Sequence, residues 1–196
     1  VSLADAALVD RVKHEILEPT LGALREAGRP FRGLLYAGLM VTATGPKVVE
    51  FNARFGDPET QAVLPLLVSS LLEPMLAIAR GDTLGQATLE WRPGYALTTV
   101  LAAAGYPGPV EKGHEIFIPS WVEEADDLLV FHAGTRRTDG KLVTDGGRVL
   151  AITALAPTIE AAAERSRAAA EAITFEGKQF RRDIGWREIR RHARAT

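Results

Sequence analysis

Apolar residues at helical spacing mark the first element of the chain. They recur four positions apart at Leu8, Val12 and Ile16, and Val9, Leu17, Leu21 and Leu24 widen the same stripe. This spacing predicts an amphipathic helix over residues 5–27, with its apolar stripe facing a core. Ser2 or Asp5 can cap the start and Gly28 can end the helix, whereas Pro19 predicts a kink or a break just before its own position.

Two extended runs follow this helix, separated by a turn. Residues 31–43 are largely apolar on both faces, which predicts a strand that is covered on both sides. Residues 44–46, Thr-Gly-Pro, form the predicted turn. Residues 47–54 then return as the antiparallel partner, so the two runs predict a β-hairpin.

The second strand of this hairpin carries the most informative pattern. Side chains alternate across a strand, so one face is predicted to be apolar and the other polar. The polar face holds Val48, Glu50, Asn52 and Arg54, and the apolar face holds Val49, Phe51 and Ala53. The polar face thus ends in a carboxylate, an amide and a guanidinium in a row.

That polar row suits the binding of a metal and a phosphate. Glu50 and Asn52 offer hard oxygen donors, which Mg²⁺ takes beside water and phosphate oxygens. Arg54 can neutralise a phosphate or a carboxylate beside the metal. Asp57 is predicted to cap a helix that begins at Glu59, where an anion can also sit. A solvated strand face followed by an ordinary helix cap explains the same residues without any function.

The remainder of the first half is predicted to be mostly helical. Residues 59–72 form a helix that Pro65 splits, and residues 73–81 add one or two helical turns that stop at Gly81 and Asp82. Residues 88–91 then form a short strand.

The pattern changes after the sequence Arg-Pro-Gly at residues 92–94, which predicts a boundary between two domains, residues 1–91 and 92–196. Residues 157–172 form an Ala-rich helix capped by Thr158. Short apolar runs predict strands over residues 95–104, 128–133, 141–144 and 149–154. The second domain is therefore expected to combine a small antiparallel sheet with helices.

Three polar features of the second domain are candidates for ligand binding, and each also has a structural explanation. His132 ends a predicted strand, before a polar loop at residues 135–137 that can meet a ribose phosphate. Residues 145–148, Asp-Gly-Gly-Arg, allow close approach of the backbone to a ligand but equally fit a hairpin turn. Arg181 and Arg182 in the basic tail are candidates for phosphate recognition, and the tail also fits a solvated C-terminal helix.

Composition narrows the class of protein. The chain has 196 residues, a formal net charge of −2 and no cysteine. This charge gives no electrostatic footprint for nucleic acid, and no apolar run approaches the ~20 residues that a membrane span needs. The lack of cysteine excludes disulfides and thiolate metal sites and fits a reducing compartment. We therefore expect a cytoplasmic protein without nucleic-acid or membrane partners.

Several strings in the sequence resemble one enzyme family. The longest unbroken one is EFNARFGDPETQ at residues 50–61, within a similar run over residues 33–67. The resemblance continues through VFHAGT at residues 130–135, TDGGRVLAITAL at residues 144–155 and FRRDIGWR at residues 180–187. Over nearly its whole length the chain resembles the phosphoribosylamine–glycine ligases, which belong to the ATP-grasp superfamily.

The resemblance implies an α+β fold. The C-terminal half of an ATP-grasp domain, an antiparallel hairpin plus helices, would precede a small antiparallel-sheet domain. The resemblance also implies Mg²⁺ or Mn²⁺ bound by Glu50 and Asn52, with Arg54 as a catalytic residue that stabilises the transferring phosphoryl group or the carboxylate. Asp57 and Glu59 then become candidates for holding the glycine amine or ordering the loop.

The implied reaction joins glycine to 5-phosphoribosylamine with ATP, giving glycinamide ribonucleotide, ADP and phosphate. The glycine carboxylate would attack the γ-phosphate, and the amine would then displace phosphate from the acyl phosphate. Chains of this family are longer, so we expect this chain to be a C-terminal portion that is inactive without the N-terminal half. Another ATP-grasp carboxylate–amine ligase, or a non-catalytic module derived from one, is the alternative.

Overall fold

The chain forms two compact units. The computed structural model describes residues 2, 4–85 and 88–195. One unit, called the hairpin unit, consists of Val1–Gly56 and Ser69–Leu89. The other, called the sheet unit, consists of Asp57–Val68 and Glu90–Thr196.

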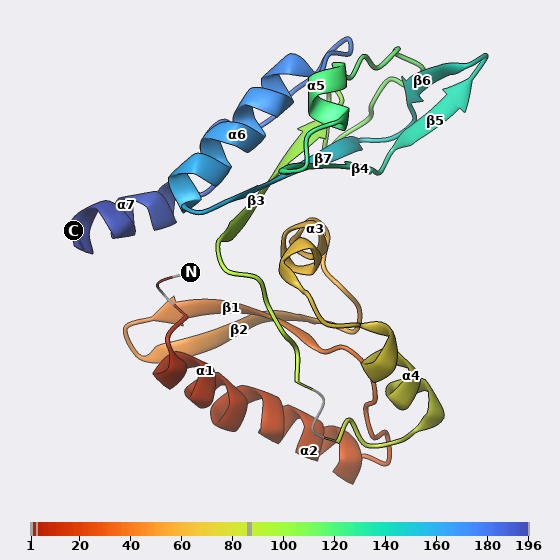
Figure 1. The fold of residues 1–196 in the computed structure, drawn as a ribbon. Helices are drawn as coiled ribbons and strands as arrows, with labels where there is room; N and C mark the ends of the chain where they lie inside the picture. The colour runs from red at the N-terminus through yellow and green to blue at the C-terminus, as the bar shows by residue number, and fades with distance from the viewer. Residues whose placement is uncertain (1, 3, 86–87, 196) are drawn as a thin grey trace. The chain divides into compact units, whose positions relative to one another are not determined.

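A long N-terminal helix opens the hairpin unit (Figure 1). It runs without a break through α1 (Ala6–Val12), η1 (Lys13–Leu17) and α2 (Glu18–Glu26). The predicted cap at Asp5 is confirmed, because its carboxylate accepts a hydrogen bond from the backbone N–H of Leu8 at 2.7 Å. Pro19 does not break the helix, since the first turn of α2 requires no donor there. The irregularity is instead the π-helical segment η1.

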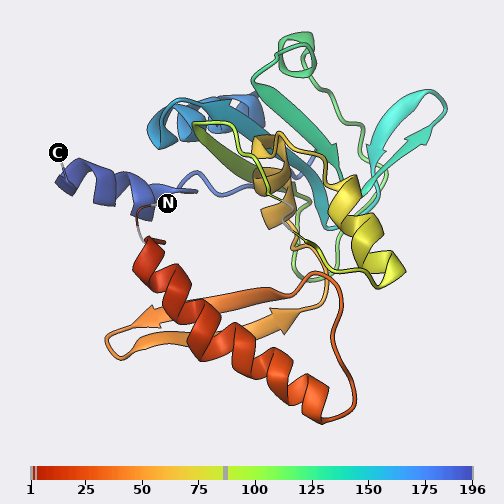
Figure 2. The same ribbon diagram turned by 60° about the horizontal axis from the view of Figure 1, so that its bottom comes forward.

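The predicted hairpin follows as β1 (Tyr36–Thr42) and β2 (Gly45–Asn52), which pair antiparallel. The helix crosses this hairpin, with α1 against β2 (Figure 2). The turn is shorter than predicted because Gly45 already belongs to β2. The expectation that residues 31–43 form a strand covered on both sides is wrong: the strand starts later, and Met40 is 58% exposed.

Helix α4 (Leu72–Arg80) completes the hairpin unit. It ends at Gly81, whose φ of +79° is the left-handed conformation that terminates many helices, so the predicted stop is confirmed. Much apolar surface stays open in this unit, including Val9 of the predicted helical stripe, whereas Ile16 of the same stripe is buried. The described residues therefore cover the apolar surface of this unit only in part.

The helix predicted over residues 59–72 is shorter in the structure and belongs to the sheet unit. It consists of α3 (Glu59–Val63) and η2 (Leu64–Leu66), after which Leu67 is extended. Pro65 explains the early end, because proline offers no N–H and its ring disturbs the preceding turn.

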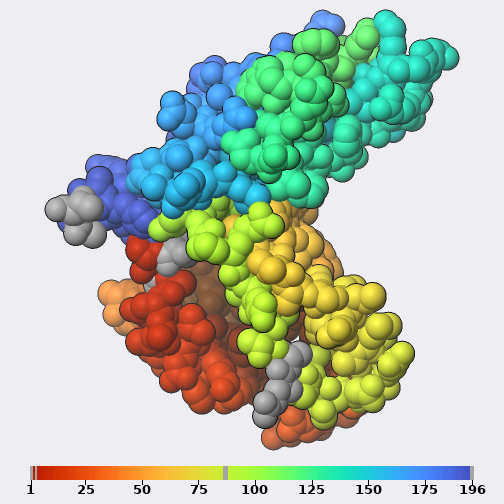
Figure 3. All heavy atoms as spheres, in the orientation of Figure 1, coloured from red at the N-terminus to blue at the C-terminus, as the bar shows by residue number. Residues whose placement is uncertain are grey.

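The strand predicted over residues 88–91 is reduced to one bridge, between Leu67 and Trp91. The backbone N–H of Val68 donates to the carbonyl of Glu90 at 2.8 Å beside it. Figure 3 shows the light-green chain that leads into the following strand lying against the gold segment of α3 and η2.

Among the described residues of the sheet unit, five strands form two antiparallel sheets. Their bounds are β3 (Tyr95–Ala102), β4 (Leu128–His132), β5 (Thr135–Thr138), β6 (Lys141–Thr144) and β7 (Arg148–Ala156). The larger sheet has the order β3-β7-β4, and the smaller pairs β5 with β6. This arrangement confirms the predicted α+β class and small antiparallel sheet. Strand β5 lies where the sequence predicts a polar loop.

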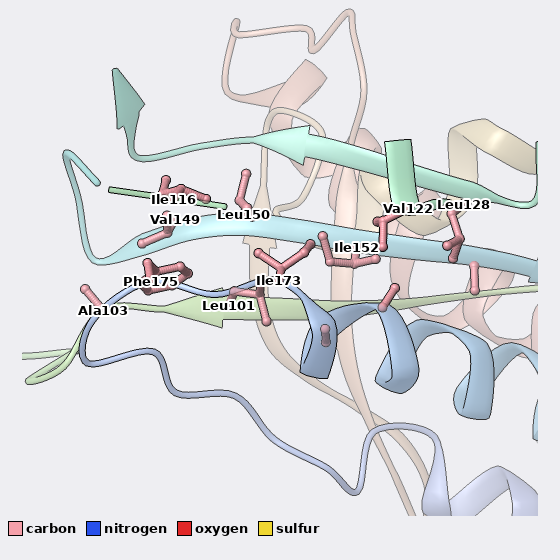
Figure 4. Close-up of a cluster of buried hydrophobic side chains, with 13 residues drawn as sticks. Leu101, Ala103, Ile116, Val122, Leu128, Val149, Leu150, Ile152, Ile173 and Phe175 are labelled. Carbon is pink, nitrogen blue, oxygen red and sulfur yellow. The ribbon is translucent and has the colours of Figure 1, made fainter. Parts of the chain in front are cut away.

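Helix α6 (Ile159–Ala172) covers one face of the larger sheet and closes the core. Its predicted cap is confirmed, because the Thr158 hydroxyl accepts from the backbone N–H of Ala161 at 3.2 Å. The fully buried side chains at the centre of this core are Leu101, Leu150, Ile152 and Ile173 (Figure 4). The short helix α5 (Ser120–Glu123) adds Val122 to it, and α7 (Trp186–Ala195) ends the chain. Within the described residues, no helix combines the length and the apolar character needed to cross a bilayer.

Helix α3 lies against the opposite face of the larger sheet. Thr99 faces α6 and accepts a hydrogen bond from Ser166 at 2.8 Å. The neighbouring Thr98 and its cross-strand partner Thr153 share the other face, where their hydroxyls lie 2.7 Å apart. There Thr153 donates to the backbone carbonyl of Gln61 in α3 at 2.8 Å. The sheet is thus a layer between α6 and α3 (Figure 1).

An ion pair ties α6 to the turn before β4. Arg165 donates Nε and Nη2 to Asp127 at 2.8 and 2.9 Å, and these hydrogen bonds hold the pKa of Asp127 below its usual value. Because the folded pKa is lowered, the pair stabilises the fold above the unfolded pKa of about 3.9. That contribution is lost as the pH falls through the lower folded value.

We expect Asp127→Asn to lower the free energy of unfolding by less than about 1 kcal/mol at neutral pH, because the pair is partly exposed. The difference from wild type should disappear once the pH falls below the folded pKa of Asp127. Urea titrations of both proteins across the acidic range measure this, and a difference that persists at the acid end would contradict it.

Candidate functional site

Glu50 and Asn52 lie side by side at the end of β2. The Asn52 side chain donates Nδ2 to Glu50 Oε1 at 3.0 Å. Across the hairpin, Glu50 is paired with Gly38, and Asn52 with Tyr36. Residues paired directly across an antiparallel ladder point to the same face. The structure therefore brings the two predicted oxygen donors together.

Val48 does not share their face, which corrects the predicted polar row. Gly38 pairs with Glu50, but the next residue, Leu39, pairs with Val48, so Val49 is an extra residue in β2. This β-bulge interrupts the period of two on which the prediction rested. Val48 consequently points to the face opposite Glu50.

Gly38 makes room for the Glu50 side chain. A Cβ atom at position 38 would lie only 3.1 Å from Glu50 Cγ and 3.7 Å from the Tyr36 ring. The first distance is shorter than ordinary van der Waals contact, so any larger residue would displace Glu50. We infer that Gly38 positions Glu50 by leaving this space empty.

Arg54 lies beyond the end of β2 rather than in the polar row. Its Nη1 donates to the neighbouring backbone carbonyl of Phe55 at 3.0 Å, and the residue is exposed. The structure therefore places Arg54 two residues past Asn52 in a bend, and the prediction that the strand extends to Arg54 is wrong.

Asp57 does not cap α3, so this part of the prediction is wrong. Pro58 occupies the N-cap position, and no side-chain cap bond is made. The Asp57 carboxylate instead accepts from Gln61 Nε2 at 3.0 Å, and its other oxygen lies 3.4 Å from Arg148 Nη1. Glu59 is the first residue of α3, a helix too short to offer a strong N-terminal anion site.

Sequence reasoning named Arg148 only as part of the loop at residues 145–148, for the close approach of its backbone, and it missed Gln61 altogether. Arg148 Nη1 also donates to the backbone carbonyl of Asp57 at 2.7 Å. Gln61 Oε1 is buried and has no hydrogen-bond partner among the described residues. Both residues lie inside strings that carry the family resemblance, yet Arg148 and Asp57 are 91 positions apart, and no local pattern indicates such a contact.

The other candidate residues in the second half of the chain form hydrogen bonds or ion pairs within the protein, which explain their positions structurally. Arg181 donates Nε and Nη2 to Asp183 at 3.0 and 2.9 Å, which lowers the pKa of that carboxyl. Arg182 pairs with Glu171. His132 Nδ1 lies 3.1 Å from the Thr135 hydroxyl.

The glycine-rich turn at residues 145–148 is explained by packing. Strand β6 pairs with β5 and not with β7, so the hairpin expected at this turn is absent. The ring of Tyr106 lies against Gly147, where a Cβ atom would come within 2.5 Å of it. Glycine is therefore needed here by a close aromatic contact.

Glu50 and Asn52 together fit a hard cation. Turning the Asn52 amide about its last torsion would present Oδ1 instead of Nδ2 beside Glu50, so both oxygens can face one ion. Among the residues that the structure describes, no group of three or more His, Cys, Asp or Glu side chains is arranged to hold a metal ion. A cation held by Glu50 and Asn52 would therefore need further ligands, such as water or phosphate oxygens.

Two family models match the sequence. The ATP-grasp (A) domain model of phosphoribosylglycinamide synthetase matches residues 1–60, and the C domain model of that enzyme matches residues 96–187. Together they cover most of the chain. The chain belongs to the phosphoribosylamine–glycine ligase family. The resemblance carried by the string at residues 50–61 is thereby confirmed.

Curated relatives in the family agree with this assignment. The phosphoribosylamine–glycine ligase of Synechocystis is 46% identical over 188 residues, which are 95% of this chain and 45% of the relative. That of Agrobacterium fabrum is 48% identical over 186 residues, which are 94% of this chain and 43% of the relative. The chain thus spans less than half the length of these relatives.

Solved structures support the fold. A crystal structure of the Thermotoga maritima phosphoribosylamine–glycine ligase matches with a TM-score of 0.78 and 38% identity, over 92% of this chain and 44% of that one. A biotin carboxylase from Campylobacter jejuni matches with a TM-score of 0.61 at 14% identity, over 93% of this chain and 39% of that one. At that identity, the second match shows a shared fold and nothing more.

Replacing Gly38 by alanine should disturb the Glu50–Asn52 pair. The added methyl group would push Glu50 Cγ by a few tenths of an ångström, so the side-chain amide resonances of Asn52 should move in NMR spectra. Gly22→Ala is the matched control, because a Cβ atom there meets nothing within 4 Å. Unchanged Asn52 resonances in Gly38→Ala would show that Gly38 does not position Glu50.

Proposed function

We propose that the protein to which this chain belongs ligates glycine to 5-phosphoribosylamine at the expense of ATP, giving glycinamide ribonucleotide, ADP and phosphate. The observation that carries the proposal is the family membership, with relatives of that name at 46% and 48% identity. Because the chain spans less than half of those relatives, the activity is assigned to the longer protein. The glycine carboxylate would attack the γ-phosphate, and the amine would displace phosphate from the resulting acyl phosphate.

Glu50 and Asn52 are the proposed ligands for Mg²⁺, or Mn²⁺ in its place. When bound, this cation would neutralise charge on the triphosphate, which otherwise repels the glycine carboxylate. The adjacent Glu50 and Asn52 side chains support the assignment, and the space that Gly38 leaves free accommodates Glu50 in this position.

Arg54 is the proposed catalytic residue, since its exposed guanidinium can stabilise the transferring phosphoryl group or the carboxylate. Asp57 and Glu59 are proposed to hold the glycine amine or to order the loop. The bonds from Arg148 and Gln61 fix Asp57 and favour the ordering role for it. Arg181 and Arg182 are proposed to meet a substrate phosphate.

We further propose a domain boundary at residues 92–94, with residues 1–91 forming part of an ATP-grasp domain and residues 92–196 the C-terminal domain. The partners would be the small-molecule substrates and the N-terminal half of the same protein. A cytoplasmic location is proposed from the absence of cysteine.

Glu50→Gln should remove most of the turnover without changing the fold. Loss of a metal-held charge costs several kcal/mol of transition-state stabilisation, so kcat for ADP formation by the longer protein should fall about 100-fold or more. Glu73→Gln is the matched control, an exposed glutamate of the same unit. Circular dichroism checks the fold, and a near-normal kcat in Glu50→Gln would overturn the metal assignment.

The substrates are tested by ADP release from the longer protein, with glycine and phosphoribosylamine each omitted in turn. ADP formation that requires both, and Mg²⁺, is expected. Release with a different acid or amine would keep the ATP-grasp chemistry and reject the substrates. No release under any condition would favour a non-catalytic module.

The 196-residue chain alone should not turn over ATP, because its family-model match to the ATP-grasp domain is confined to residues 1–60. The same ADP assay measures this, and Mg²⁺-dependent turnover by the isolated chain would contradict the expectation.

A further inference from the structure

A strip of positive charge runs along the exposed side of α7. It borders a shallow cavity of about 210 Å³, and the described residues that line this cavity include no acidic side chain. Residues three, four and seven positions apart lie on one face of a helix, which brings the charges of the strip together. The cavity is lined by one tryptophan and four arginines, here called the arginine strip: Trp186, Arg187, Arg190, Arg191 and Arg194.

The buried side of α7 determines which residues the helix exposes. Helix α7 begins beside the start of α6, where Ile189 packs against Ile159 and Ala162 (Figure 1). Glu188 is only 6% exposed, and it accepts a hydrogen bond from Arg191 Nη1 at 3.2 Å. These contacts fix the rotation of the helix about its axis. The arginine strip therefore faces outward because of how the rest of the helix is packed.

Three of the four arginines keep their charge available for a ligand. Arg191 pairs with Glu188, whereas no carboxylate among the described residues pairs with Arg187, Arg190 or Arg194. The Cζ atoms of Arg187 and Arg190 lie 5.4 and 5.6 Å from the centre of the Trp186 ring. Stacking on an aromatic ring restricts a guanidinium group but leaves its N–H donors free. The strip is thus both charged and partly preorganised.

The size and the contacts of the cavity favour a small anion that carries several charges. A volume of about 210 Å³ is below that of most cavities for drug-sized ligands, so a compact ligand fits it better. Proteins that bind single-stranded nucleic acid stack bases on aromatic rings, but arginines already engage the Trp186 ring. Linked phosphates, by contrast, offer oxygens to several guanidinium groups at once.

The arginine strip is separate from the residues of the proposed function. The C domain model of the family ends at residue 187, so most of the strip lies beyond the sequence that the family model describes. Arg181 and Arg182, proposed above to meet a substrate phosphate, do not line this cavity. They pair with Asp183 and Glu171 instead.

We propose that the arginine strip binds a compact oligophosphate, which is a chain of two or more linked phosphates, either free or as the phosphate tail of a nucleotide. Arg187 and Arg190 hold one end of this chain beside Trp186, and Arg194 holds the other end, about one helical turn away. The site goes beyond the proposed function, because it requires neither glycine nor phosphoribosylamine.

The test uses inorganic triphosphate as the probe. It is titrated without Mg²⁺ into the 196-residue chain and followed by calorimetry and by the indole N–H resonance of Trp186. Arg190→Gln and Arg194→Gln should each raise the Kd about tenfold, because a hydrogen bond to a charged group is lost. Arg167→Gln is the matched control, an exposed arginine of α6 outside the cavity, and it should leave the Kd unchanged.

A second titration, with ATP, distinguishes the two sources of the phosphate chain. A Kd equal to that of triphosphate would show that the phosphates alone are recognised, and a lower Kd would identify a nucleotide as the ligand. Both results support the proposal only if Arg190→Gln weakens the binding of ATP as well.

Four outcomes would overturn the proposal. The first two are no binding of triphosphate, and binding that neither strip variant weakens. The third is inorganic phosphate binding as tightly as triphosphate, which would indicate an adventitious ion only. The fourth is an oligoglutamate peptide binding as tightly, which would make the strip a docking surface for an acidic protein segment. Circular dichroism checks that both variants fold, and the ADP assay tests the ligase activity independently.

Discussion

Two hydrogen bonds from β7 hold the segment that follows the candidate metal strand. Arg148 donates to the carbonyl of Asp57, and Thr153 donates to the carbonyl of Gln61. A segment with only two short helical pieces has little regular backbone bonding of its own, so these side chains supply the constraint that fixes it. The roles proposed for Asp57 depend on the position that these two bonds give to the segment. Strand β7 is itself fixed by its neighbours, since it is the central strand of its sheet and is buried beneath α6.

The same device shapes both candidate regions. Val49 is an extra residue next to Glu50 in β2, and Val149 is skipped in the pairing of β3 with β7, directly beside Arg148. A bulge re-aims the side chains that follow it and increases the local twist, which is why bulges are common near functional sites. In the hairpin, the bulge separates Val48 from Glu50, so an apolar side chain and a charged one are not forced onto one face. In the sheet unit, Arg148 comes directly before the bulge at Val149 and lies opposite Ala102.

The sequence predicts those parts of the fold whose causes are local. The cap at Asp5, the cap at Thr158 and the stop at Gly81 depend on residues within a few positions of one another, and the structure confirms them. The bulge at Val49 cannot be recognised in the sequence pattern, so the prediction wrongly placed Val48 in the polar row. Asp57 is also a residue type that often caps helices, but Arg148, which is 91 positions away in the sequence, bonds to Asp57 instead. The pairing of distant residues is set by tertiary structure, which a one-dimensional pattern does not contain.

Gln61 shows what this tertiary arrangement costs. The Asp57 carboxylate accepts a hydrogen bond from Gln61 Nε2. If the amide turned over, its oxygen would face the carboxylate, and two acceptors cannot bond to each other, so the orientation of the amide is fixed. Its Oε1 is consequently turned into the interior, where no described residue donates to it. A buried acceptor without a donor costs about 1–3 kcal/mol, which a charge-assisted bond to Asp57 can offset. An N–H or O–H group that came to lie beside Oε1, such as that of a buried water, would recover that free energy.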